Sequence, residues 1–479
     1  MLFNSIQFAL FFTLVFLLYW FATGKKYKIQ NILLLVSSYY FYGCWNWHFL
    51  FLLIFSTGLD YFTGLMMADA PNKRKKQLWF WLSVCVNLGF LGVFKYYNFF
   101  IDSFADLLAA FGLQAHFSTL QVILPVGISF YTFHGLSYVI DIYNDRIKPE
   151  RNFINYSVFV CFFPLLVAGP IERATHLLPQ ITKARVFDYE KAVDGLRQIL
   201  WGLFKKIVIA DNCATVVNSV FDNYQSQSAS NLALGAVLFA FQIYGDFSGY
   251  SDIALGTARL LGIELLRNFG FPYFSRDIAE FWRRWHISLT TWFRDYLYIP
   301  LGGSRGSKWM SIRNTFIIFL VSGFWHGANW TFLFWGAFHA VLFLPLLIFG
   351  RNRLHTNSVA GGKFFPSFRE FIQMIVTFGL VVIGWIFFRA PSLTVSFHYL
   401  SSLLSSSFFT LPTYKITTLG IFVFILLITE WIQREKKHGL AQFEILVKFK
   451  SVRWVFYVFL ILSIIQFGGK SETFIYFQF

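Results

Sequence analysis

The chain has 479 residues, of which 56% are hydrophobic and only 13% are charged. About a quarter of the residues in a soluble globular protein are charged, so the composition argues against that class. Apolar runs of about 18 residues or more recur along the chain, which indicates an all-α membrane protein with many spans. No alternation of apolar and polar residues dominates, which argues against a membrane β-barrel.

The formal net charge is +16. Lysines and arginines gather in short loops between apolar runs, as in the positive-inside pattern of membrane proteins, and no nucleic-acid-binding motif is present. The four cysteines form no CxxC pair, so we expect structural thiols and no metal site; they are Cys44, Cys85, Cys161 and Cys213. The first apolar run lacks a basic start and a cleavage site, which predicts an uncleaved membrane helix.

The basic loops 24–29 and 70–77 orient the first part of the chain, because loops rich in lysine and arginine face the cytoplasm. They predict an N-terminus outside and crossings near 2–22, 30–46, 49–67, 78–100 and 119–141. Segment 101–118 carries aspartates but no lysine or arginine and is expected outside. The basic segment 145–151 is expected inside.

The apolar run 154–170 does not fit this alternation, because the residues that follow it are rich in lysine and arginine. Pro164, Gly169 and Pro170 interrupt the run. We therefore expect a re-entrant element, which membrane proteins tolerate where protein or a cavity covers the broken backbone. A true crossing with an unusually basic outside loop is the alternative.

The second half predicts further crossings. Segments 198–221 and 231–261 predict a hairpin with its tip outside, and segment 262–314 is expected inside. The remaining predicted elements are 314–350, which goes out and back or forms broken helices, and crossings near 370–389, 416–432 and 453–469. This amounts to eleven to thirteen transmembrane helices, with both termini outside and residues 1–479 forming one multi-pass domain.

The stretch WHGANW places polar side chains inside a very apolar segment. His326 follows Arg313 by about 20 Å of helix, which predicts a position near the middle of the bilayer. Gly323 and Gly327 allow a close approach of backbones or a break in the helix. His326 and Asn329 are expected on one helical face. The imidazole can act as a general base, or it can make a structural hydrogen bond to another helix.

Segment 276–304 predicts an amphipathic helix at the cytoplasmic surface. One face would carry Trp282, His286, Leu289 and Phe293. Glu280 can pair with Arg283 and Arg284. The apolar face would turn its histidine towards the membrane interior, and the basic residues can attract an anionic donor such as the phosphates of coenzyme A. The alternative is a plain interfacial helix with an incidental histidine.

Asp246 and Asp252 lie in the apolar segment 241–263. They are six residues apart and do not share a helical face, which argues against a paired-carboxylate mechanism. A polar pathway and a cation site remain open, and we favour structural pairing with an arginine. The chain has no Walker A loop, GxSxG elbow, HExxH motif or Rossmann fingerprint.

Five stretches between about 120 and 345 carry a family resemblance: PVGISFYTFHGLSYVID, FFPLLVAGPIER, FQIYGDFSGYSDIALG, RDIAEFWRRWHISLTTWFRDYLYIPLGGS and FWHGANWTFLFWGAFHA. In this order they resemble the membrane-bound O-acyltransferase family. The likeness is to its bacterial branch, which includes the alginate O-acetyltransferase membrane subunit. The teichoic-acid D-alanyl transfer protein is more distant.

The resemblance implies that His326 is the family's essential histidine and His286 its second one. It implies a many-helix fold with a tunnel in the bacterial inner membrane, where donor and acceptor meet from opposite faces. The expected reaction moves an acetyl group from a cytoplasmic thioester, acetyl-CoA, to a hydroxyl of an exported polysaccharide such as alginate, or to a periplasmic relay partner. No permanently bound cofactor is expected. Weaker candidates for substrate contacts are Trp325, Asn329, Trp282, Ser288 and Arg283.

Two alternatives remain at this stage. A related branch would transfer D-alanyl groups or acylate peptidoglycan. A different class, a transporter or flippase, would use His326, Asp246 and Asp252 as a proton relay. Substitution of the aspartates would then abolish transport, whereas substitution of His326 would abolish acyl transfer.

Overall fold

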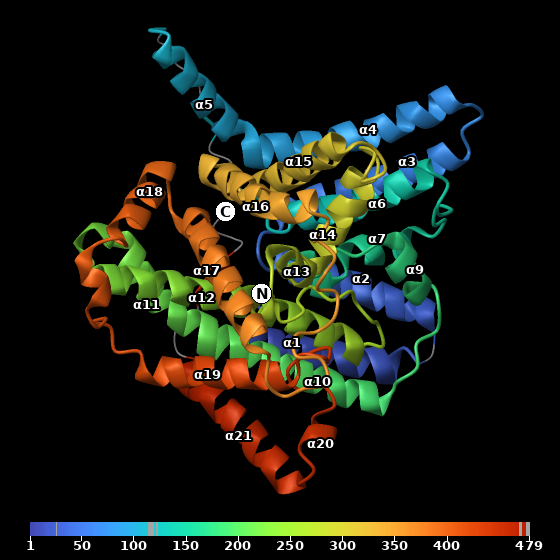
Figure 1. Cartoon of the computed structure of the whole chain (residues 1–479). Coiled ribbons are helices and arrows are strands. Elements are labelled where there is room, and N and C mark those ends of the chain that lie inside the picture. The colour runs from blue at the N-terminus through green and yellow to red at the C-terminus, as the bar shows by residue number, and fades with distance from the viewer. Residues whose placement is uncertain (25, 114–118, 121–122, 469–471, 476–479) are drawn as a thin grey trace. The chain divides into compact units, whose positions relative to one another are not determined.

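The computed structural model describes every residue except 25, 114–118, 121–122, 469–471 and 476–479 (Figure 1). Its regular elements are helices, and no strand occurs among the described residues. The chain forms two compact units. The first comprises Met1–Asp188 and Ala258–Leu265, and the second comprises Tyr189–Thr257 and Leu266–Phe479.

Among its described residues, the first unit contains nine α-helices. They are α1 (Ile6–Leu17), α2 (Tyr27–Gly43), α3 (His48–Ala68), α4 (Lys73–Leu91), α5 (Tyr97–Ala110), α6 (Ile128–Tyr143), α7 (Phe153–Cys161), α8 (Phe163–Leu166) and α9 (Ala174–Ile181). The π-helical turn η1 (Leu18–Ala22) extends α1, and η2 (Gly92–Tyr96) joins α4 to α5. The predicted helices near 2–22, 30–46 and 49–67 are therefore present.

The helix that begins at Lys73 runs further than the sequence indicated. It continues through α5 to Ala110, so residues 101–110 of the segment expected outside are helical. The stretch Tyr97–Ala110 contains no glycine or proline that would end a helix, and Gly112 is the first residue beyond it with a positive φ, +76°. The next helix, α6, begins at Ile128 and not near 119.

Buried polar residues hold α3, α4 and α6 together. The carboxylate of Asp60 on α3 accepts hydrogen bonds from Ser83 Oγ at 2.6 Å and Asn87 Nδ2 at 2.7 Å, both on α4. The Cα of Gly135 on α6 lies so close that a Cβ there would overlap the Asp60 carboxylate. Small and hydrogen-bonding residues at helix contacts are typical of membrane proteins, because the hydrophobic effect contributes little to helix association in lipid.

The run 154–170 is broken as predicted. α7 ends at Cys161, Phe162 has an extended ψ of 114°, and a single turn, α8, follows with Pro164 near its start. The nine residues of α7 rise by about 14 Å, less than half of the roughly 30 Å hydrocarbon core. α7 alone is therefore too short to cross a bilayer.

In the part that the structure describes, the second unit contains twelve α-helices. They are α10 (Tyr189–Leu203), α11 (Asp211–Asp222), α12 (Ala229–Leu260, up to Thr257 in this unit), α13 (Ile278–Arg284), α14 (Ile287–Phe293), α15 (Lys308–His326), α16 (Trp330–Ile348), α17 (Phe368–Arg389), α18 (Leu393–Ser402), α19 (Thr417–Ile432), α20 (Phe443–Leu446) and α21 (Lys450–Phe467). The π-helix η3 (Phe204–Ala210) joins α10 to α11, and together they form the first arm of the predicted hairpin. The helix α12 forms the second arm, so this hairpin is present.

The two arms of this hairpin pack through their backbones. A Cβ on Gly249 of α12 would lie 2.7 Å from the carbonyl oxygen of Gly202 on α10, so neither arm can carry a side chain there without moving. Beside this contact, Asp252 pairs with Lys205 at 2.7 Å and Asp246 with Lys206 at 2.8 Å. The expected structural pairing is therefore present, but the partners are lysines and not arginines.

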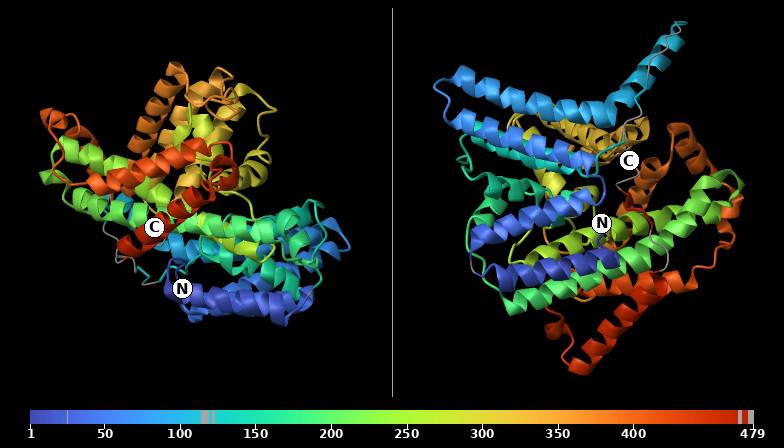
Figure 2. Two further views of the ribbon diagram at one scale, coloured as in Figure 1. Left: turned by 90° about the horizontal axis from the view of Figure 1, so that it is seen from below. Right: turned by 180° about the vertical axis from the view of Figure 1, so that it is seen from behind.

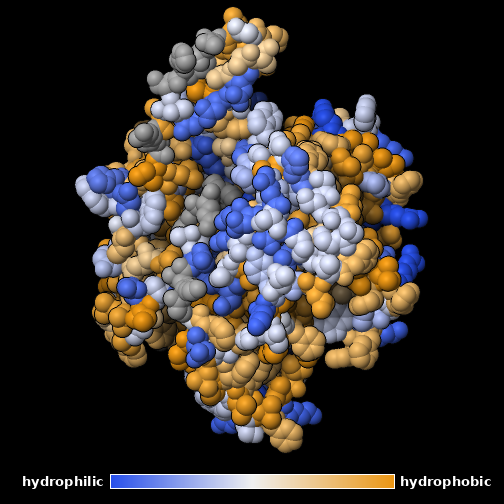
Figure 3. Space-filling model, turned by 90° about the vertical axis from the view of Figure 1, so that its left-hand side faces the viewer, coloured by the Kyte–Doolittle hydropathy of each residue, from blue (hydrophilic) through white to orange (hydrophobic). Residues whose placement is uncertain are grey.

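Six helical stretches are long and apolar enough to cross a membrane, among the residues that the structure describes. They are His48–Ala68, Lys73–Ala110, Ala229–Leu260, Trp330–Ile348, Phe368–Arg389 and Lys450–Phe467. Ile6–Ala22 and Thr417–Ile432 are shorter apolar helices. Large hydrophobic areas reach the surface of the molecule, as a lipid environment requires (Figure 3). The chain is thus a multi-pass helical membrane protein.

Candidate active site

The helices α15 and α16 form a tight antiparallel hairpin, seen as the adjacent yellow and orange helices in Figures 1 and 2. A Cβ on Gly323 would overlap the carbonyl oxygen of Phe332. Further along the hairpin, a Cβ on Gly336 would overlap the carbonyl oxygen of Phe319. The two glycines therefore let the backbones touch and fix the end of α15, where His326 lies.

The turn of this hairpin differs from the predicted one. α15 ends at His326 itself, and the next residue, Gly327, is extended. Asn329 lies outside the helix and caps α16, since its Oδ1 accepts from Thr331 N at 3.0 Å and its Nδ2 donates to Pro391 O at 3.1 Å. The prediction that His326 and Asn329 share a helical face was wrong, because the helix stops between them.

Segment 276–304 is not one helix. α13 ends at Arg284, Trp285 is extended, and His286 adopts left-handed dihedral angles with φ +42° before α14 begins. Asn268 holds this break, because its carbonyl accepts from Ile287 N at 2.8 Å and its Oδ1 accepts from Ser288 Oγ at 2.6 Å. Ser288, a candidate for substrate contact, therefore supports the turn that presents His286.

Buried charges anchor α13. The carboxylate of Glu280 accepts from Arg284 at 2.8 Å, as predicted, and from Arg276 at 3.0 Å. Glu280 is only 1% exposed, so these two arginines compensate its buried charge. Arg283, another candidate, does not pair with Glu280 but donates to the backbone carbonyls of Asn352 at 2.7 Å and His355 at 2.8 Å.

The two candidate histidines, each almost fully buried, lie together. The ring centroids of His286 and His326 are 6.4 Å apart, although the residues come from separate elements. Trp325 lies against both rings, at 5.8 Å from His286 and 4.9 Å from His326. Phe247 contacts His286 edge-on at 4.7 Å, and Phe388 contacts His326 at 5.4 Å. The arrangement is a pair of imidazoles in an aromatic enclosure.

A second layer of aromatic rings lies behind His326. Trp335 contacts His326 at 5.2 Å and also packs at 5.6 Å against Trp282, a candidate for substrate contact. It further contacts His339 on α16 at 5.0 Å. His339 and Trp335 were not among the candidates predicted from the sequence. Their spacing of four residues is a signal for a shared helical face.

His286 has an unusual environment. Both ring nitrogens are buried, and neither makes a hydrogen bond to any residue that the structure describes. The residue lies outside the six candidate spans, and burial lowers its pKa to about 3. His286 is therefore neutral at physiological pH, and one ring nitrogen carries a proton that it can donate while the other can accept one.

The pH dependence of the protein's stability should show that the imidazole of His286 is buried in its neutral form. The folded state resists protonation of His286 down to about pH 3, whereas the unfolded chain binds the proton below its ordinary pKa of about 6.5. Stability should therefore fall as the pH drops below 6.5, by about 2 kcal/mol at pH 5. We expect the melting temperature of the wild type to fall more between pH 7 and pH 5 than that of His286→Gln. Equal slopes would contradict a buried neutral His286.

No group of three or more histidine, cysteine, aspartate or glutamate side chains is placed to hold a metal ion in the described part of the chain.

Comparisons with known proteins bear on what the enclosure does. The family model of the membrane-bound O-acyltransferases matches residues 144–382, which include both histidines. The chain is 40% identical over 406 residues to the probable alginate O-acetylase AlgI of Pseudomonas aeruginosa, covering 85% of this chain and 75% of that protein. The chain belongs to the membrane-bound O-acyltransferase family.

Other proteins similar to this chain are named for different activities. The peptidoglycan O-acetyltransferase of Helicobacter pylori is 35% identical over 398 residues, covering 78% of this chain and 73% of that protein. The teichoic acid D-alanyltransferase of Bacillus subtilis is 29% identical over 293 residues, covering 57% of this chain and 71% of that protein. This family member is therefore an O-acyltransferase, and the resemblance that the sequence indicated is confirmed.

Proposed function

We propose that this protein transfers an acetyl group from a cytoplasmic thioester, acetyl-CoA, to a hydroxyl of an exported polysaccharide such as alginate, or of a periplasmic relay protein. The observation that carries the proposal is the buried pair His286 and His326, 6.4 Å apart between ring centroids, in a member of an acyltransferase family. The proposed location is the bacterial inner membrane with both termini in the periplasm.

His326 is the proposed general base. Its imidazole takes the proton of the acceptor hydroxyl as the oxygen attacks the thioester carbonyl. The resulting tetrahedral intermediate collapses, the carbon–sulfur bond breaks, and the imidazolium returns the proton to the departing thiolate. An ester and a free thiol result, so atoms and charge balance without another reactant.

His286 is proposed to stabilise the oxyanion that forms on the thioester carbonyl. Its neutral ring carries one N–H, and the ring has no hydrogen-bonding partner among the described residues that would compete with a substrate. A preorganised donor in a dry enclosure is more effective than one in water, since it needs no reorganisation during the reaction.

The transporter alternative is not favoured. Each of its two proposed relay carboxylates is paired with a lysine, Asp246 with Lys206 and Asp252 with Lys205, which suits a structural role. The chain's membership of an acyltransferase family also supports an enzyme.

The donor and acceptor can be tested with the protein in sealed proteoliposomes. We expect acetyl-CoA labelled in its acetyl group to release free coenzyme A and to label an uronate polymer, or a partner protein, added on the opposite side. A carrier protein loaded with D-alanine as thioester is the matched donor control and should give no transfer. Transfer from that carrier and not from acetyl-CoA would overturn the proposal and assign the D-alanyl branch.

A further inference from the structure

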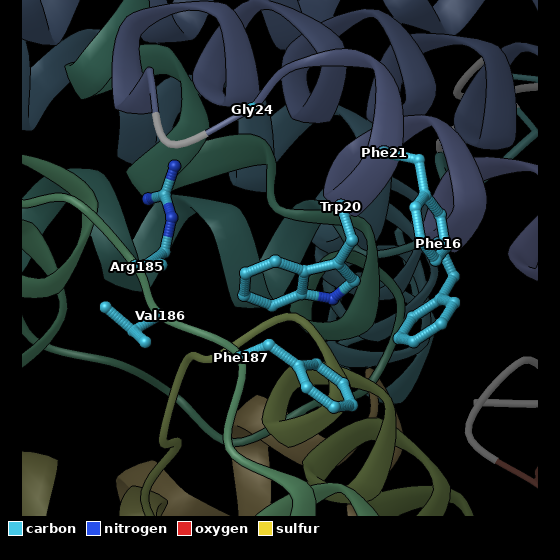
Figure 4. A pocket seen from close by; sticks show the side chains of 7 residues that line it. All are labelled: Phe16, Trp20, Phe21, Gly24, Arg185, Val186 and Phe187. Atoms are coloured by element: carbon cyan, nitrogen blue, oxygen red, sulfur yellow. The ribbon is translucent and has the colours of Figure 1, made fainter.

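A groove of about 540 Å³ opens on the first unit, beside the end of the apolar helix Ile6–Ala22 (Figure 4). Its walls are aromatic and aliphatic side chains from two separate parts of the chain. They are Phe16, Trp20 and Phe21 on one side, and Val186 and Phe187 on the other. Its size is in the range of sites that hold small molecules.

Some side chains in the walls of the groove pack against other residues, whereas others are exposed. Phe187 makes edge-on contacts with Trp20 at 5.4 Å and with Phe16 at 6.3 Å. Trp20 is held in place because its Nε1 donates to the carbonyl of Leu260 at 3.0 Å. In contrast, Phe21 and Val186 are 79% and 69% exposed. These exposed apolar surfaces suit contact with a hydrocarbon chain.

A buried cation lines the same groove. The guanidinium of Arg185 is only 4% exposed, and its hydrogen bonds go to neutral oxygens. The nearest are Asn31 Oδ1 at 2.6 Å and Gln30 Oε1 at 3.3 Å, and the others are backbone carbonyls of Tyr27, Gln180 and Ile181. Arg185 makes no ion pair with a residue that the structure describes. The guanidinium also lies over the ring of Tyr19, with Cζ 5.6 Å from the ring centroid, so its contacts are to neutral groups and leave a net positive charge.

Other positively charged residues are close in the sequence to the residues that line the groove. Lys26 and Lys28 follow the lining residue Gly24, and Lys183 precedes Arg185 by two positions; all three lysines are exposed. On the acidic side, Asp188 and Glu190 follow the lining residue Phe187 in the sequence. Within a few residues, the surface therefore changes from aromatic to cationic, as at the boundary between acyl chains and headgroups of a bilayer.

We propose that this groove binds an anionic phospholipid, with an acyl chain between Trp20 and Phe187 and the headgroup phosphate near Arg185, Lys26 and Lys28. The apolar walls match the acyl chain, and the net positive charge of Arg185 and the nearby lysines matches the phosphate. This inference does not depend on the acyl transfer proposed above, because the groove belongs to the first unit and both histidines to the second.

The test uses the purified full-length protein, stripped of lipid and then incubated with equal amounts of phosphatidylglycerol and phosphatidylethanolamine. Native mass spectrometry counts the lipids that stay bound. We expect preferential retention of phosphatidylglycerol. The double variant Lys26→Gln/Lys28→Gln should weaken that binding about tenfold or more. The matched control Lys73→Gln/Lys75→Gln removes the same charge from another exposed basic segment of the first unit and should keep the preference.

A second variant tests the groove without removing a packed ring. Val186→Asp places a negative charge on an exposed wall and should abolish retention of phosphatidylglycerol, while the melting temperature stays close to that of the wild type. Equal losses in the two double-lysine variants would overturn the proposal, since they would indicate general surface charge. Equal retention of both lipids, or displacement of the lipid by inorganic phosphate, would overturn it as well.

Discussion

Replacing His326 by alanine should reduce acyl transfer by about a thousandfold or more. The expectation follows from its proposed role as general base, because positioned bases typically contribute 10²–10⁴-fold to a rate. The ring lies at the end of α15 among Trp325, Trp335 and Phe388, so its loss leaves the helix hairpin itself in place. The measurement is the turnover of the thioester with a hydroxyl acceptor, together with thermal melting in detergent.

The chain offers a matched control for this variant. His339 is fully buried on α16 and contacts Trp335, as His326 does. Unlike His326, it makes no ring contact with His286 among the described residues. His339→Ala creates a comparable cavity and should keep transfer within about tenfold of the wild type. Unchanged transfer in His326→Ala would exclude the proposed mechanism. Equal losses in both variants would show that packing, and not proton transfer, explains the effect.

The second large effect is expected at Gly323. Gly323→Val should destabilise the protein by about 3 kcal/mol or more, because a side chain there overlaps the carbonyl oxygen of Phe332 in the facing helix. Backbone cannot move aside as a flexible side chain can, so α15 and α16 must separate. Since α15 ends at His326, the separation should also displace the ring and lower acyl transfer in whatever protein still folds.

Gly379 provides the control for this substitution. It lies in the candidate span α17, and a Cβ there would meet no atom within 4 Å. Gly379→Val should therefore change the stability by only about 0.5 kcal/mol. The measurement is the melting temperature of both variants in the same detergent. If both glycine variants melted alike, the close approach of α15 and α16 would not be the cause.

The sequence predicted some of these features for reasons that are local. Prolines and glycines marked the break in 154–170, and the structure has its break at Phe162. The apolar runs predicted the hairpin of 198–261, which the structure contains with a π-helical joint. Such features depend on residues close together in the chain, so periodicity and helix breakers suffice to find them.

Other expectations failed because distant residues decide the local structure. The apolar spacing of 276–304 fits one amphipathic helix, but the chain breaks at Trp285 and His286. Asn268 stabilises this break by accepting hydrogen bonds from the backbone of Ile287 and the side chain of Ser288. Because Asn268 lies outside 276–304, the residue pattern within that segment could not predict the break. Asn329 caps α16 in the same way and does not continue α15.

The amino-acid sequence alone thus determined the class of the protein, its membrane-spanning character and its family, and it singled out a histidine inside an apolar segment as the catalytic candidate. Tertiary structure decided which groups surround that histidine. Helical phasing relates residues of one element only, whereas His286 and His326 come from α14's start and α15's end. Their 6.4 Å separation depends on how the break after α13 and the glycine contact of α15 with α16 place those two ends.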